Sequence, residues 1–186
     1  QGPTFVLAAG KRDAPPVVFF HGSLSNSITW AGELSRLAQK YRLYAIDMIG
    51  EAGKSAEARP SLHSAAYGQW LQEVFQQLGV SQAILVLPYL LLGRWGAKRL
   101  YRKILGPLAH ELEGTELSRF LQTIATYVKP RTEPLPIFSD QQLGMISCPV
   151  LLLIGGQDIM LYPEQIRHRL KQNLQHYEEV YIDNAG

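Results

Sequence analysis

The sequence has 186 residues, of which 46% are hydrophobic and 18% are charged. This composition suits one globular domain and excludes disordered, collagen-like and coiled-coil chains. A net charge of +2 excludes a general electrostatic attraction to nucleic acid, and a single cysteine excludes an intramolecular disulfide framework.

Short apolar runs alternate with helical periods along the chain, which predicts an α/β fold with a largely parallel sheet. Helical spacing of apolar residues predicts helices over Trp30–Tyr41 and Tyr67–Leu78, and Gly79 is placed to end the second. Pro163 opens the last predicted helix. Strands are predicted at Phe5–Ala8, Val17–Phe20, Leu43–Ile46, Ala83–Val86, Val150–Ile154 and Val180–Ile182.

The segment at residues 88–138 breaks this alternation. Two helical segments, Leu90–Leu105 and Glu111–Val128, lead into a proline-rich passage, which predicts a helical insertion instead of another strand–helix unit. Ser139 and Asp140 form a good N-cap pair, and the alternation resumes there. The expected organisation is a first core part at residues 1–87, the insertion at 88–138 and a second core part at 139–186.

Three loops follow the ends of predicted strands, which is where open α/β sheets bind their ligands. They are His21-Gly22-Ser23-Leu24, the loop from Asp47 to Ser55, and Gly155-Gly156-Gln157-Asp158. In this order and spacing they resemble the loops of the α/β-hydrolase family, and residues 88–138 resemble that family's lid. The resemblance implies a mostly parallel central sheet flanked by helices. It also implies a serine hydrolase that cleaves an ester or related acyl bond and needs no cofactor.

The resemblance also implies roles for residues in the first and third loops. In the family, the His-Gly turn brings backbone N–H groups to the carbonyl oxygen under attack, where preorganised donors stabilise the oxyanion. The matching donors are the N–H groups of Ser23 and Leu24, and His21 then braces the loop. Asp158 matches the acid that orients the catalytic histidine. The alternative for Asp158 is a loop or helix-capping aspartate before Pro163.

The second loop allows a different interpretation. It resembles the family's Asp-x-x-Gly-x-Gly-x-Ser turn with one extra residue, but Gly53-Lys54-Ser55 also imitates a phosphate-binding loop. That motif requires a glycine five residues before Gly53, where the chain has Met48. The spacing therefore argues against a nucleotide site.

Two parts of the family pattern are missing from the printed sequence. A Gly-x-Ser-x-Gly nucleophile elbow should follow Ala83–Val86, yet the chain continues into Leu87 and Pro88 and contains no such motif. The catalytic histidine is expected after the last strand, where the sequence ends at Gly186. We therefore expect an incomplete record of a longer chain, with a junction near Leu87/Pro88 and an early stop at Gly186. The alternative is a catalytically inactive protein of the same fold that binds a small molecule or a partner.

The expected partner is a small-molecule acyl substrate, without nucleic acid and without stable membrane insertion. The segment Arg94–Lys103 holds five cations in ten residues, which favours either a solvated outer face of the lid or weak contact with an anionic interface. No signal peptide is visible, so we expect a cytoplasmic protein, and the start at Gln1 is consistent with a trimmed N-terminus. Cys148, just before an apolar run, is expected to be a small buried residue.

Overall fold

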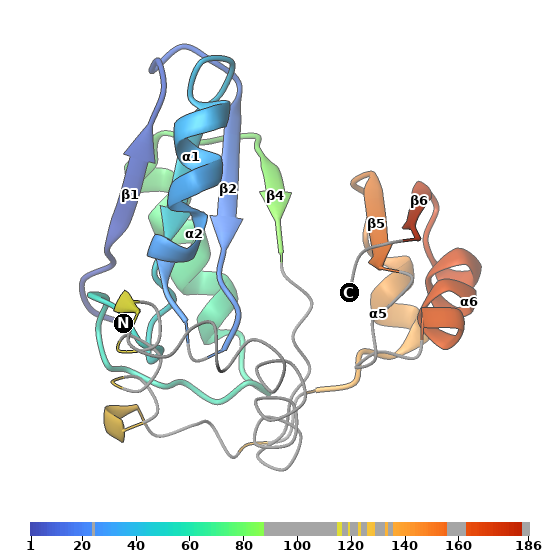
Figure 1. Cartoon of the computed structure of the whole chain (residues 1–186). Helices are drawn as coiled ribbons and strands as arrows, with labels where there is room; N and C mark the ends of the chain where they lie inside the picture. The colour runs from blue at the N-terminus through green and yellow to red at the C-terminus, as the bar shows by residue number, and fades with distance from the viewer. Residues whose placement is uncertain are drawn as a thin grey trace. The chain divides into compact units, whose positions relative to one another are not determined.

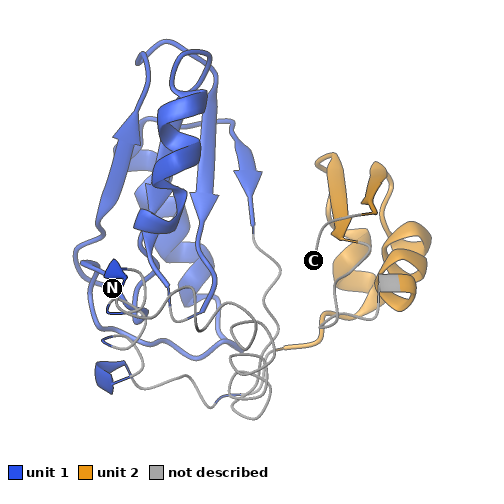
Figure 2. Ribbon diagram, in the orientation of Figure 1, with its two compact units in different colours: residues 1–135 blue, residues 136–186 orange. Residues whose placement is uncertain are grey.

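The computed structural model describes residues 1–23, 25–87, 115, 116, 119, 123, 126–128, 133, 136–155 and 163–183. The chain divides into two compact units, residues 1–135 and residues 136–186, which are coloured separately in Figure 2. Most of the insertion predicted at residues 88–138, including the basic segment Arg94–Lys103, lies outside the described residues.

The first unit is built on a four-stranded sheet with the strand order β1-β3-β2-β4 (Figure 1). β2 runs parallel to both β3 and β4, and β1 runs antiparallel to β3. The strands are β1 (Val6–Ala9), β2 (Pro16–Phe20), β3 (Arg42–Ile46) and β4 (Ile84–Val86). The four strands predicted here are confirmed, with shifts of about one residue at their ends.

Two helices cover opposite faces of this sheet, α1 (Ala31–Leu37) and α2 (Ala66–Leu78). Successive side chains of a strand point to opposite faces, so the continuous apolar runs of β2 and β3 supply both cores. The core on the α2 side contains Val18, Phe20, Tyr44, Ile46, Ile49, Trp70 and Val74. The core on the α1 side contains Val17, Phe19, Leu34, Leu43 and Ala45.

The predicted bounds are accurate at the end of α2 but too wide for α1. α2 ends where predicted, because Gly79 takes the left-handed conformation (φ +67°) that glycine adopts without strain. α1 is shorter than the predicted Trp30–Tyr41. The side chain of Asn26 accepts a hydrogen bond from the N–H of Ile28 and starts a 3-10 turn, η1 (Ser27–Trp30), before α1 begins.

The second unit contains α5 (Asp140–Gly144), β5 (Val150–Gly155), α6 (Pro163–Asn173) and β6 (Tyr177–Ile182). β5 and β6 form a parallel pair. Ser139 caps α5 as predicted, in a reciprocal capping box with Gln142. β6 begins three residues before the predicted Val180, because Glu178 and Glu179 break the apolar run from which the strand was predicted.

Glu179 joins β6 to α6 through an ion pair. The Arg167 guanidinium donates from Nε to Glu179 Oε2 at 3.1 Å and from Nη2 to the other oxygen, and the Tyr177 hydroxyl donates to Oε2 at 2.8 Å. These hydrogen bonds, that from Arg167 foremost, lower the pKa of Glu179 to about 2. Burial, together with the bond to Glu179, raises the pKa of Tyr177 to about 12.

The margins of both sheets expose apolar side chains. Ile84 and Leu85 of β4 are exposed, and so are the aliphatic side chains on one face of the β5–β6 pair, namely Leu151, Leu153, Val180 and Ile182. Among the residues that the structure describes, β4 pairs with β2 alone and β5 pairs with β6 alone. A parallel sheet normally has both faces covered, so apolar side chains on an uncovered face, such as those of the β5–β6 pair, are unusual.

Two further observations concern Cys148 and the lengths of the described helices. The prediction that Cys148 is buried is wrong: its side chain is exposed, because it lies in the turn before β5, where neither face of the sheet covers it. Within the described ranges, no helix has the length and apolar character needed to span a membrane.

Candidate functional site

The carboxyl ends of β2 and β3 lie side by side and direct two buried polar residues to one edge of the sheet. Phe20 pairs with Ile46 in the parallel register, so the next residues along the two strands, His21 and Asp47, leave the sheet together. Their side chains are only 4% and 2% exposed. This edge is where a parallel sheet places a ligand site.

His21 holds two backbone groups with its imidazole. Nε2 accepts a hydrogen bond from the N–H of Met48 at 2.9 Å, and Nδ1 lies 2.8 Å from the carbonyl oxygen of Gly22. Because Nε2 accepts, the proton belongs on Nδ1, which donates to that carbonyl. Both ring nitrogens are therefore occupied by the backbone. This supports the prediction that His21 braces the loop and is not a catalytic base.

Asp47 connects two loops through its carboxylate. Oδ1 accepts from the N–H of Ser27 at 2.7 Å, and Oδ2 accepts from the N–H of Lys54 at 2.8 Å. The carbonyl oxygen of Asp47 also accepts from the Ser55 hydroxyl at 2.6 Å, and that hydroxyl oxygen accepts from the N–H of Phe5 at 2.8 Å. The turn after β3 is thus closed by hydrogen bonds to its own first residue.

These contacts argue against a phosphate-binding loop at Gly53-Lys54-Ser55. The Lys54 N–H, which a phosphate would need, binds Asp47, and the Lys54 ammonium lies 5.0 Å from the centre of the Phe5 ring. No helix begins at Ser55, since residues 56–65 are irregular. A phosphate loop requires that helix, because its N-terminus helps to hold the phosphate.

Ser23 lies in the turn between two fixed points of the first loop. Its side chain is exposed, and its N–H makes no hydrogen bond to any residue that the structure describes. Beyond it, the indole N–H of Trp30 donates to the carbonyl oxygen of Phe20 at 3.1 Å and ties η1 back to the end of β2. The loop can therefore present the Ser23 N–H as a donor without losing an internal bond.

The remaining predicted site residues lie outside the described residues. Leu24 is one of them, and so is Asp158, although β5 is described as far as Gly155. That Ser23 and Asp158 share a site stays a prediction, as does the junction near Leu87/Pro88. In the described part of the chain, no three His, Cys, Asp or Glu side chains are grouped as metal ligands.

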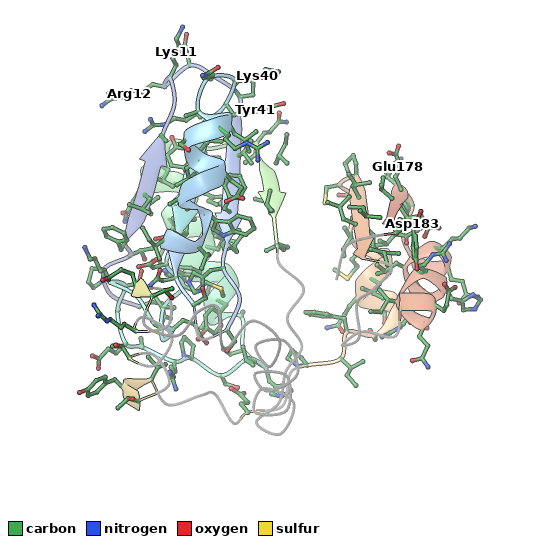
Figure 3. The ribbon with its side chains drawn as sticks, in the orientation of Figure 1. Lys11, Arg12, Lys40, Tyr41, Glu178 and Asp183 are labelled. Atoms are coloured by element: carbon green, nitrogen blue, oxygen red, sulfur yellow. The ribbon has the colours of Figure 1, made fainter. Side chains whose placement is uncertain are left out.

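Three basic side chains of the first unit, Lys11, Arg12 and Lys40, lie away from this edge. Figure 3 shows Lys11, Arg12, Lys40 and Tyr41 at the other end of the sheet, where β1 turns into β2 and where α1 leads into β3. At the candidate site, the buried polar groups are His21 and Asp47, which hold backbone N–H donors of the loops after β2 and β3.

Sequence reasoning missed the role of Asp47, which it placed in a motif without assigning its contacts. The signal was the glycine six residues later. A Cβ atom on Gly53 would lie 2.4 Å from Asp47 Oδ2, so the missing side chain leaves room for the carboxylate.

Comparisons with known proteins agree with this fold. No family model matches the chain. It is 26% identical to the uncharacterised carboxylesterase nap of Bacillus subtilis, over all of this chain and 77% of that protein. The crystal structure of naproxen esterase from the same organism superposes with a TM-score of 0.75 at 23% identity, covering all of this chain and 81% of that one. MGS-M2, an α/β hydrolase from a deep-sea metagenome, gives a TM-score of 0.72 at 15% identity, covering 98% of this chain and 86% of that one.

The match to the nap carboxylesterase runs over 233 positions, whereas this chain has 186 residues. That relative therefore carries residues within the matched region that have no counterpart here.

The similarities to the nap carboxylesterase and to the solved esterase and hydrolase structures support a hydrolase. The loops at the strand ends, the sheet order and the agreement with solved structures show that the chain has the α/β-hydrolase fold.

Proposed function

We propose that this protein is a serine hydrolase that cleaves a carboxylic ester or a related acyl bond of a small molecule. The observation that carries the proposal is the loop at residues 21–27. It is anchored at both ends by buried side chains and leaves the Ser23 N–H unbonded among the described residues. The similarity to the nap carboxylesterase supports the reaction class.

In the proposed mechanism, attack of a serine hydroxyl on the acyl carbon places negative charge on the former carbonyl oxygen. The N–H of Ser23 donates to that oxygen, with Leu24 N–H as the second candidate. A preorganised donor of this kind typically contributes about 2.7–4 kcal/mol to transition-state stabilisation. Asp158 accepts the N–H of the catalytic imidazole, holds its tautomer and stabilises the imidazolium that forms.

We further propose that the nucleophilic serine and the catalytic histidine belong to segments outside the 186 printed residues. Two observations support a missing internal segment near Leu87/Pro88. The relative has matched-region residues that this chain lacks, and β4 ends next to an exposed Leu87. The proposed lid at residues 88–138 would then cover the acyl site.

A second candidate function is binding without catalysis. The sequence favours it in one respect, because it contains no Gly-x-Ser-x-Gly motif. The protein would then keep the fold and bind an acyl compound or a partner at the same edge.

Hydrolysis of p-nitrophenyl acetate and butyrate by the full-length gene product and by the 186-residue chain separates the two functions. Serine hydrolysis predicts turnover by the full-length protein and none by the 186-residue chain. It also predicts that Asp158→Asn lowers kcat by a factor of about 100 or more. A full-length protein that binds these esters without turnover would favour the binding function. Turnover that Asp158→Asn leaves unchanged would remove Asp158 from the mechanism.

A further inference from the structure

The loop that carries Ser23 is anchored to two consecutive residues after β3. At its start, His21 Nε2 accepts from the N–H of Met48. At its end, the N–H of Ser27 donates to Asp47 Oδ1. Residues 22–26 therefore connect two anchor points, His21 bonded to Met48 and Ser27 bonded to Asp47.

Asp47 is the stronger of these anchors. A carboxylate that accepts from a backbone N–H makes a short, charge-assisted bond, and here Ser27 N–H lies at 2.7 Å and Lys54 N–H at 2.8 Å. Ser27 is itself buried, so neither partner of that bond is exposed to water. Among the ion pairs of the described residues, none includes Asp47.

The space around Asp47 leaves its carboxylate little freedom. A Cβ on Gly53 would meet Oδ2 at 2.4 Å and the carboxyl carbon at 2.7 Å, so the side chain is enclosed by the turn that it closes. Because one oxygen of the Asp47 carboxylate is held by the turn after β3 and the other by Ser27, the position of the turn after β3 constrains the position of the loop after β2.

We propose that Asp47 is a positioning residue for the oxyanion donor. By holding Ser27 N–H with one oxygen and Lys54 N–H with the other, it determines where the Ser23 N–H points. This inference rests on the proposed function, since a donor is positioned only with respect to a reacting oxygen. Asp47 touches neither the substrate nor the nucleophile and acts through the loop.

Asp47→Asn tests the inference, because the amide has the same shape but turns one accepting oxygen into a donor that faces a backbone N–H. We expect kcat of the full-length protein towards p-nitrophenyl butyrate to fall at least about tenfold while KM changes by less than about twofold. The inhibition constant of a phenylboronic acid, whose tetrahedral adduct places an oxygen where the oxyanion forms, should rise by the same factor as kcat falls. A merely destabilised protein would not show this split.

Two glycine substitutions provide a matched pair. Gly53→Ala keeps the charge of Asp47 but displaces its carboxylate, so it should reproduce the loss in kcat. Gly68→Ala adds the same methyl group on the exposed side of α2, where nothing lies within 4 Å, and should leave kcat and KM unchanged. Equal effects of the two substitutions would contradict a specific role for the space beside Asp47.

Amide hydrogen exchange on the 186-residue chain gives a readout that needs no activity. In Asp47→Asn, the amide of Ser27 or Lys54 should exchange at least about tenfold faster, with Val18 in β2 unchanged. Faster exchange in a protein whose full-length wild type cleaves no ester would refute the proposed function while keeping Asp47 as the residue that holds the loop. Unchanged exchange, or unchanged kcat in an active enzyme, would overturn the inference.

Discussion

His21 shows how a single buried residue can be assigned a role from its hydrogen bonds. Its two ring nitrogens serve Met48 and Gly22, so replacing it leaves the Met48 N–H without an acceptor. An unsatisfied buried donor costs about 1–3 kcal/mol. We therefore expect His21→Ala to lower the free energy of unfolding by about 1–3 kcal/mol in urea denaturation.

The exposed His168 of α6 provides the control for this prediction. His168→Ala removes the same imidazole from a solvated position and should change the free energy of unfolding by less than about 0.5 kcal/mol. Equal losses in the two variants would show that the His21 contacts contribute nothing to stability.

Glu179 makes stability depend on pH in the acid range. Its pKa falls from an ordinary 4.5 to about 2 in the folded protein, chiefly through the Arg167 hydrogen bond. A carboxyl with a lowered folded pKa stabilises the protein above its unfolded pKa, and this contribution is lost as pH falls. The stability difference between wild type and Glu179→Gln should therefore be constant above about pH 5 and shrink from about pH 4.5 to pH 2.

The measurement is the urea midpoint of both proteins at several pH values between these limits. Glu178→Gln is the control, because Glu178 is exposed and the alternation of side chains along a strand places it on the other face of β6 from Glu179. A pH-independent difference for Glu179→Gln would contradict the ion pair.

At the scale of elements, the sequence predicted what depends on local periodicity and missed what depends on distant contacts. The α2 period and its terminal Gly79 were both predictable. The start of β6 was not, because Glu178 and Glu179 break the apolar run, and the pairing of Glu179 with Arg167 of α6 cannot be read from the local sequence. The Asp47 contacts were not predictable either, since Ser27 lies 20 residues away in sequence. Parallel pairing brings the residues after β2 and β3 to one edge of the sheet. Only the folded loops show which atoms form hydrogen bonds there.

The end of α2 offers a test of one local prediction. Gly79 has φ +67°, and a methyl group added there would have nothing within 4 Å, so a side chain meets conformational strain and no clash. Gly79→Ala should lower the free energy of unfolding by about 1–2 kcal/mol. In the same helix, Gly68→Ala should raise it by about 0.5–1 kcal/mol, because alanine favours the helix. Thermal denaturation that shifted both variants in the same direction would contradict the assignment of Gly79 as the helix terminus.

At the scale of the whole molecule, the exposed apolar margin of the β5–β6 pair is the feature to explain. Leu153 is 61% exposed and its neighbour Ile154 is 7% exposed. In the 186-residue chain, Ile154→Ala should cost about 2–5 kcal/mol, whereas Leu153→Ala should cost less than about 0.5 kcal/mol. If a further segment of the full-length protein covers this face of the β5–β6 pair, Leu153→Ala becomes costly there as well. A cost below about 0.5 kcal/mol in both proteins would contradict a covering segment.

The proposed reaction makes one claim that a single measurement can decide, which is the location of the nucleophile. The full-length protein is treated with a fluorophosphonate that bonds to activated serines, digested, and analysed by mass spectrometry. We predict one labelled serine, in a Gly-x-Ser-x-Gly peptide that falls between Leu87 and Pro88 of the printed sequence. A label on any serine within the 186 residues, or no label on a folded full-length protein, would contradict the account.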